Sequence, residues 1–88
     1  MTKAQFHRIS KALADPTRYQ ILSRIAREDE LACVDLRCDL PITPATLSHH
    51  LKELSAAGLI DMRKSSKFIH LKLRDKVWKD YLAILARL

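Results

Sequence analysis

Apolar residues recur at three- and four-residue spacing along most of this chain, a pattern that predicts helices with one buried face each. The predicted helices cover residues 2–14, 16–28, 32–39, 44–57 and 76–88. The helix at 2–14 is predicted to bury Phe6, Ile9 and Leu13, and the helix at 16–28 is predicted to bury Tyr19, Leu22, Ile25 and Ala26. Around the short helix at 32–39, Leu31, Val34 and Leu40 are predicted to turn inward, and the helix at 44–57 is predicted to bury Leu47, Leu51 and Leu54. The pattern therefore predicts a mainly helical chain.

Capping residues mark the starts of three of these helices. Thr2, Asp15 and Thr43 each stand just before a helix, where a side-chain oxygen can accept a free backbone N–H. Proline follows Asp15 and Thr43 directly, at the first helical position, where its missing N–H costs nothing. These starts fix the beginnings of the predicted helices more firmly than their ends.

The spacing of apolar residues changes to two after Gly58, the chain's single glycine and the usual residue just past a helix end. Residues 59–63 and 68–74 are predicted to form two strands, joined by the polar segment 64–67. On the second strand one side holds Ile69, Leu71 and Leu73. Asp75 follows and is expected to cap the last helix.

The predicted order is four helices, a two-stranded hairpin and a final helix. A short helix at 32–39, a turn at 40–43 and a polar-faced helix at 44–57 make a helix-turn-helix, and the hairpin after it is a wing. The predicted fold class is therefore mainly α with a small β-hairpin, a winged helix-turn-helix. A length of 88 residues leaves room for one domain, which we expect to span residues 1–88.

The helix at 44–57 carries a polar face that suits the major groove of DNA. When its leucines are buried, a rotation of about 100° per residue turns a second face outward. That face holds Ala45, Thr46, Ser48, His49, Lys52 and Ala56. Alanines permit close approach, the hydroxyls and the imidazole can bond base edges, and the lysine can pair with phosphate. Thr43 begins this helix, whose free N–H groups and dipole also favour phosphate.

The two adjacent histidines are predicted to differ in role. His49 points outward, whereas His50 falls on the flank of the buried face, where a packed and hydrogen-bonded ring is expected. Neighbouring residues on a helix point about 100° apart, so the pair is not expected to chelate a metal. For the same reason Ser48 and His49 cannot act as a catalytic dyad, and we expect no enzyme activity.

Basic residues concentrate in the part of the chain that is predicted to bind DNA. The formal net charge is +6, and residues 43–74 hold six basic and only two acidic groups. The hairpin supplies candidate contacts to phosphate or the minor groove, namely Arg63, Lys64, Ser65, Ser66 and Lys67. The alternatives are a solvated basic surface, or a winged-helix module that binds a protein and not DNA. The second alternative predicts an exposed apolar patch where the helix at 44–57 shows small and polar residues.

Several other classes are excluded by the sequence. The first ten residues carry charges and no long apolar run, so we expect no secretory signal. No segment approaches the roughly 18 uninterrupted apolar residues of a membrane span, and the expected location is the cytoplasm. A single glycine argues against a glycine-rich phosphate-binding loop.

Two motifs resemble the ArsR/SmtB (arsenic-repressor) family of regulators. Residues 11–18, Lys-Ala-Leu-Ala-Asp-Pro-Thr-Arg, followed by Ile21-Leu22, resemble its opening signature. Residues 46–52, Thr-Leu-Ser-His-His-Leu-Lys, with Leu54 and residues 57–60, resemble its recognition helix and the exit into the wing. The resemblance covers nearly the whole chain. It implies a homodimeric repressor that binds a two-fold symmetric operator in double-stranded DNA and is released when an effector binds.

The resemblance also implies a dimer interface made by the first and last helices, at about residues 2–14 and 76–88. The candidate interface residues are Phe6, Ile9, Val77, Trp78, Tyr81, Ile84, Leu85 and Leu88. The broad apolar face of residues 77–88 fits that role independently. Burial in the chain's own core is the alternative for each of these side chains.

The chain departs from the family at both of its usual metal sites. Metal-sensing members carry a Cys-x-Cys pair just after Glu-Leu, but here residues 30–34 read Glu-Leu-Ala-Cys-Val, with one cysteine between the two expected positions. A second family site uses Asp and His on the last helix, which here has Asp75 and Asp80 but no histidine. No cofactor is expected, and a metal or metalloid effector is left open.

Cys33 and Cys38 are the remaining candidates for an effector or redox site. Two cysteines are too few for a disulfide scaffold. On a continuous helix a separation of five residues places two side chains about 140° apart, which is a poor geometry for chelation or for a disulfide. A pair of small, half-buried thiols without a role is the alternative.

Overall fold

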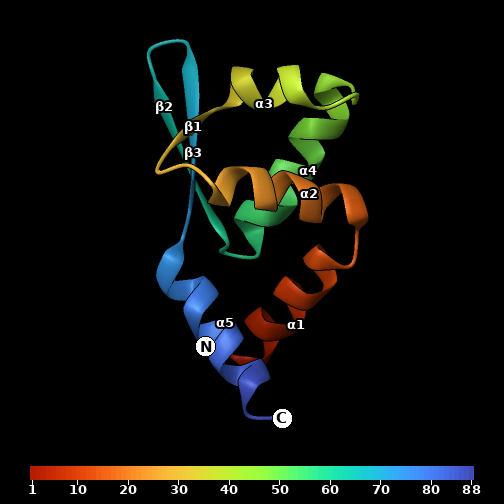
Figure 1. The fold of residues 1–88 in the computed structure, drawn as a ribbon, viewed down its shortest axis with the longest axis vertical. Coiled ribbons are helices and arrows are strands. Elements are labelled where there is room, and N and C mark those ends of the chain that lie inside the picture. Colours follow the sequence, from red (N-terminus) through yellow and green to blue (C-terminus); the bar gives the residue numbers. More distant parts are fainter.

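The computed structural model describes all 88 residues and places the predicted elements in the predicted order (Figure 1). The helices are α1 (Lys3–Leu13), α2 (Pro16–Ala26), α3 (Cys33–Asp39), α4 (Pro44–Ala56) and α5 (Asp75–Ala86). The strands are β1 (Leu31–Ala32), β2 (Ile60–Ser65) and β3 (Phe68–Leu73). The predicted winged helix-turn-helix is confirmed, and β1 is the one element that the sequence did not predict.

The molecule is elongated, with principal extents of 40 × 23 × 20 Å. Figure 1 shows α1 and α5 together at one end, where both termini lie, and the tip of the β2–β3 hairpin at the other end. In the same view α3 lies beside the hairpin, and α2 lies between the two ends. No helix has the length and apolar character that a crossing of a lipid bilayer needs.

The predicted caps hold three of the helix starts. The side-chain oxygens of Thr2, Asp15 and Thr43 each accept the backbone N–H of the residue three positions later, at 3.0–3.1 Å. The backbone bond from Arg18 lowers the pKa of Asp15. The expected cap at Asp75 is wrong: Arg74 occupies the N-cap position without a side-chain bond. Asp75 lies instead in the first turn of α5, where its negative charge interacts favourably with the positive end of the helix dipole.

Gly58 ends α4 in the left-handed conformation, with φ +79°. The N–H of Leu59 donates to the carbonyl of Leu54 at 3.1 Å, and the N–H of Gly58 donates to the carbonyl of Ser55 at 3.0 Å. This pair of bonds is a Schellman motif, and the side chains of Leu54 and Leu59 are both fully buried beside it. The motif turns the chain from α4 directly into the wing.

The strands form one antiparallel sheet in the order β1-β3-β2. Leu71 on β3 pairs with Leu31 on one side and with Met62 on the other. The connection from β2 to β3 is only two residues long, and Ser66 begins it with φ +57°. A positive φ is usual at this position of a tight hairpin turn.

The core is built from every helix and from all three strands. Its fully buried side chains include Ile9, Ile21, Ile25, Leu36, Leu47, Leu54, Leu59, Ile60 and Leu71. Three residues predicted on buried faces are exposed: Tyr19 is 56% exposed, Val34 is 47% exposed, and Ala26 is also exposed.

These errors concern the phase of two helices, α2 and α3. The side of α2 that contacts α1, α4 and β3 carries Ile21, Leu22 and Ile25, which turns Tyr19 toward solvent. On the next helix, Leu31 belongs to β1, so α3 begins at Cys33, one residue later than predicted, and buries Leu36 in place of Val34.

Candidate nucleic-acid interface

The outward face of α4 is the first part of the candidate interface. Ala45, Thr46, Ser48, His49, Lys52 and Ala56 are all exposed, as the periodicity predicts. The opposite face buries Leu47, His50, Leu51 and Leu54. The exposed side chains are short or polar, so a DNA groove could approach the helix backbone closely along this face.

The N-terminus of α4 is also arranged to receive an anion. The Thr43 hydroxyl accepts the N–H of Thr46 and donates its own proton to the Thr46 hydroxyl oxygen at 2.9 Å. That chain of bonds leaves the Thr46 hydroxyl proton free to donate outward. The first turn holds no acidic residue, so the helix dipole favours a phosphate at this end.

His50 holds α4 in position and is not part of the outward face. Its side chain is buried, and its Nδ1 accepts a hydrogen bond from Nε of Arg18 at 3.3 Å. Because Nδ1 is an acceptor, the ring carries its proton on Nε2. Arg18 also donates to the carbonyl of Ala12 at 3.5 Å, so one side chain connects α1, α2 and α4. The sequence predicts the packed histidine but gives no sign that Arg18 is its partner.

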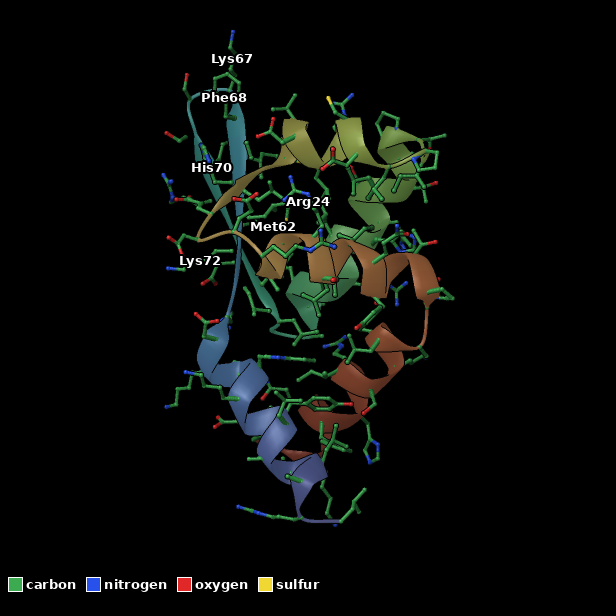
Figure 2. The ribbon with its side chains drawn as sticks, in the orientation of Figure 1. Arg24, Met62, Lys67, Phe68, His70 and Lys72 are labelled. Carbon is green, nitrogen blue, oxygen red and sulfur yellow. The ribbon has the colours of Figure 1, made fainter.

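The hairpin tip is the second part of the candidate interface. Lys64, Ser65, Ser66 and Lys67 are exposed, and Figure 2 shows Lys67 and Phe68 at the far end of the wing. The Lys67 ammonium lies 5.7 Å from the centre of the Phe68 ring. The tip therefore carries two cations with no acidic partner, at the end of the molecule away from α1 and α5.

Arg63 differs from the other predicted wing contacts, because the protein itself binds its side chain. Its Nε and one terminal nitrogen donate to Glu30 Oε1, at 3.2 and 2.5 Å. The same carboxylate lies 3.9 Å from Nδ1 of His70, which is paired with Arg63 across the sheet. The Arg63 bond lowers the pKa of Glu30. Arg63 thus braces the loop before β1 against the wing, a role that the sequence does not indicate.

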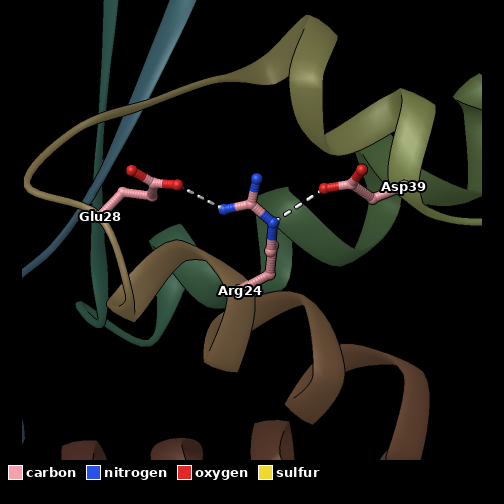
Figure 3. A network of polar contacts seen from close by, with 3 residues as sticks. All are labelled: Arg24, Glu28 and Asp39. Atoms are coloured by element: carbon pink, nitrogen blue, oxygen red, sulfur yellow. Dashed lines mark hydrogen bonds and ion pairs between the residues drawn. The ribbon is translucent and has the colours of Figure 1, made fainter.

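A second ion-pair cluster sets the position of α3 beside α2 (Figure 3). The Arg24 guanidinium donates to Asp39 at 2.8 Å and to Glu28 at 3.0 Å. The carboxylate of Asp39 is the main reason that the pKa of Arg24 is raised. The pairs are partly exposed, so each contributes modestly to stability, and the Arg24–Asp39 pair is the one that joins α2 to α3.

The end of the molecule formed by α1 and α5 leaves much apolar surface uncovered. Tyr81 is the one buried residue of α5, and its hydroxyl lies 2.8 Å from the Ser10 hydroxyl oxygen. Its ring lies 5.1 Å from that of Phe6 and 5.8 Å from that of Trp78. The exposed apolar side chains of α5 and the C-terminus are Leu82, Leu85 and Leu88. Half-buried beside them are Phe6, Val77, Trp78 and Ile84.

Ile9 requires a correction among the candidate interface residues. It is fully buried within the single chain and belongs to its core. It therefore has no surface to offer a partner, and the alternative of intramolecular burial holds for this residue. Tyr81 is only 5% exposed, so it too is almost fully buried within the single chain.

Both cysteines lie on α3 with free thiols. Cys33 is half-buried, which raises the pKa of its thiol, and Cys38 is exposed. Because α3 is continuous between them, the geometric objection to a chelate or a disulfide applies. Nowhere in the chain are three His, Cys, Asp or Glu side chains placed together to hold a metal ion.

Comparison with known proteins agrees with this geometry. The sequence profile of a helix-turn-helix domain family matches residues 13–63. The cadmium resistance transcriptional regulatory protein CadC of Listeria innocua is 35% identical over 60 residues, which are 68% of this chain and 50% of that protein.

Two solved structures are also similar. An ArsR-like transcriptional regulator from Rhodococcus has a TM-score of 0.84 and 26% identity, over 96% of this chain and 78% of that chain. The homodimeric winged helix-turn-helix DNA-binding domain Mb0332 from Mycobacterium bovis has a TM-score of 0.78 and 25% identity, over 94% of this chain and 77% of that chain. The chain spans 50% to 58% of the length of this CadC and of three other curated resistance regulators that it matches.

Proposed function

Because this chain belongs to the ArsR family of winged helix-turn-helix transcriptional regulators, we propose that it binds a two-fold symmetric operator in duplex DNA as a homodimer. The observation that carries the proposal is the outward face of α4, with its capped N-terminus and its small and polar side chains. In this proposal α4 enters the major groove. Ser48 and His49 reach base edges, while Thr43, Thr46 and Lys52 contact phosphates.

The wing supplies contacts that do not depend on sequence. Lys64 and Lys67 are the cations that reach beyond the sheet, and the serines between them can donate to phosphate. We assign Arg63 to the support of the wing, since Glu30 already accepts its hydrogen bonds. Six basic and two acidic residues between positions 43 and 74 give this part of the chain its affinity for a polyanion.

The dimer is proposed to form through the end of the molecule that holds α1 and α5. Leu82, Leu85 and Leu88 are exposed there without a function in the single chain. A single 88-residue domain buries a modest share of its surface, so a second copy that covers these leucines stabilises both chains. The Mycobacterium bovis domain is homodimeric, which supports the same arrangement here. In this proposal residues 1–88 act as one DNA-binding unit with terminal helices for dimerisation.

Regulation is proposed to be repression relieved by an effector. The support is the resemblance to the ArsR/SmtB (arsenic-repressor) family. The CadC relative is itself a cadmium resistance transcriptional regulatory protein. The effector is not identified by either usual metal site, because both are incomplete in this chain. The binding geometry contains no nucleophile with a base beside it, and we propose a regulator without enzyme activity.

Fluorescence anisotropy of the reduced protein with labelled duplex from upstream of its own gene tests this function. A scrambled duplex of equal length is the control, and each is titrated at several salt concentrations. We expect binding in the nanomolar range for the specific duplex, with a steep decline as salt rises. Weak binding that is equal for the two duplexes would remove sequence-specific recognition from the account.

Variants separate the two kinds of contact in the same assay. Ser48→Ala should weaken binding to the specific duplex and leave the scrambled duplex nearly unchanged. Lys64→Ala should weaken binding to both duplexes and flatten the salt dependence. Val34→Ala is the matched control, because Val34 is exposed on α3 and lies outside both proposed contact faces.

A further inference from the structure

A groove of about 460 Å³ opens between α4 and the wing. Its lining includes Cys33 at the start of α3, Leu51, Lys52 and Ser55 on α4, Met62 on β2 and Ile69 on β3. This volume falls in the range of about 300–1,000 Å³ that is typical of small-molecule sites. The mechanism of DNA recognition proposed above uses only its α4 rim and leaves the rest without a function.

The walls of this wing groove are apolar and uncovered. Met62 pairs directly with the buried Leu71, and Ile69 lies two residues before Leu71 on the same face of β3. That face is covered by the core at Leu71 and continues into the groove, where Met62 is 41% exposed and Ile69 is 37% exposed. A flexible methionine beside a branched aliphatic side chain can adapt to an aliphatic guest.

The charge of the groove lining favours an anionic ligand. Lys52 is its single charged residue, and no acidic side chain lines the groove or forms an ion pair with Lys52. The exposed hydroxyls of Ser48 and Ser55 stand on the same side of α4, one turn before and one turn after Lys52. One cation with two hydroxyl donors at the rim of an apolar cleft is complementary to a carboxylate that carries an aliphatic chain.

We propose that the wing groove binds a medium-chain aliphatic carboxylate, with the carboxylate at Lys52 and the chain along Met62 and Ile69. Since Ser48 and Lys52 also belong to the face that α4 presents to DNA, an occupied groove excludes DNA. This antagonism rests on the proposed function, whereas binding of the carboxylate does not. The groove then provides direct release from DNA without a metal site.

The two cysteines allow the site to be tested within one molecule. Cys33 lies in the groove lining, and Cys38 is exposed on α3 outside it. Decanoate, held below its micelle-forming concentration, should slow alkylation of Cys33 by iodoacetamide and leave Cys38 unchanged, as followed by mass spectrometry. At about ten times its Kd, mass action predicts about a tenfold slowing. Affinity should rise about fourfold per methylene from octanoate to decanoate.

Two controls test the charge of the ligand's head group and the apolar wall of the groove. Decyltrimethylammonium has the same chain with a positive head and should give no protection of Cys33. Met62→Gln should weaken decanoate binding by at least about fourfold, the loss of one methylene contact. Val34→Gln introduces the same side chain on exposed α3 outside the groove and should change nothing.

The outcomes separate the site from the proposed function. If decanoate protects neither cysteine at millimolar concentration, or protects both alike, the site is refuted. If DNA protects Cys33 and decanoate does not, the groove holds the DNA backbone and the carboxylate proposal fails, while DNA binding stands. If decanoate protects Cys33 in a protein that binds no DNA, the site stands and the proposed function fails. Protection of Cys33 together with release of labelled DNA supports both.

Discussion

Replacement of Gly58 by alanine should destabilise the protein, because Gly58 has φ +79° at the end of α4. A residue with a Cβ in the left-handed region costs about 1–2 kcal/mol. Loss of glycine's freedom in the unfolded chain offsets about 0.4–1 kcal/mol of that cost. We therefore expect Gly58→Ala to lower the free energy of unfolding by about 1 kcal/mol, which for a domain of this size lowers Tm by about 4–8 °C.

A second source of strain at this position can be separated from the first. A Cβ on Gly58 would lie 2.8 Å from Nε2 of Gln5 on α1. That nitrogen is the far end of a flexible side chain and can move away, so we assign the main cost to the backbone. Gln5→Ala should consequently restore little of the stability that Gly58→Ala loses. Gly58→Asn should lose less than Gly58→Ala, because asparagine tolerates the left-handed region better.

Thermal unfolding followed by circular dichroism, at one fixed protein concentration, measures these differences. The fixed concentration matters because association of two chains raises Tm by mass action. A Gly58→Ala protein as stable as the parent would refute the assignment of strain to this turn. Full recovery of Tm in the Gln5→Ala double variant would show instead that the side-chain contact is the cause.

Four further predictions follow from the interface and from the dimer. His49→Ala should cost about 1–3 kcal/mol of binding to the specific duplex and little to a scrambled one, measured by anisotropy. Lys67→Ala should weaken binding to both duplexes, the specific and the scrambled one, and should lower the slope of log affinity against log salt concentration by about 1. At pH values above the ordinary Glu pKa of 4.5, Glu30→Gln should lower Tm, because Arg63 lowers the pKa of Glu30 and stabilises its charged form. The difference in Tm between the variant and the parent should vanish as the pH falls through the lowered pKa of Glu30. Leu85→Glu should raise the dimer dissociation constant at least about tenfold, as measured by sedimentation, because a buried unpaired carboxylate costs more than about 1.4 kcal/mol. A Leu85→Glu dimer of unchanged affinity would show that Leu85 lies outside the interface.

The features that the sequence predicts well depend on neighbouring residues. The caps at Thr2, Asp15 and Thr43 each need only a backbone N–H three residues away, and all three form. The outward face of α4 follows from helix geometry once Leu47, Leu51 and Leu54 are buried. Exposure of the candidate DNA contacts could thus be derived without tertiary information.

The features that the sequence does not predict depend on partners far away along the chain. Arg18 and His50 are 32 residues apart, and Glu30 and Arg63 are 33 residues apart. No local pattern distinguishes Arg63, which is tied to Glu30, from Lys64, which is not. The strand β1 is only two residues long, and both its pairing with β3 and the burial of Leu31 depend on residues far along the chain, so it leaves no periodic signal of its own.

Protection of guanine N7 from methylation by dimethyl sulfate tests the central claim most directly, because that atom lies in the major groove. The duplex is one that the protein binds selectively in the anisotropy titration. If two copies each place α4 in the major groove, protection should appear in two patches about one helical turn apart, or a multiple of it, and His49→Ala should weaken both patches equally. Protection in a single patch, or a bound duplex with no protected guanine, would contradict recognition by a symmetric dimer through α4.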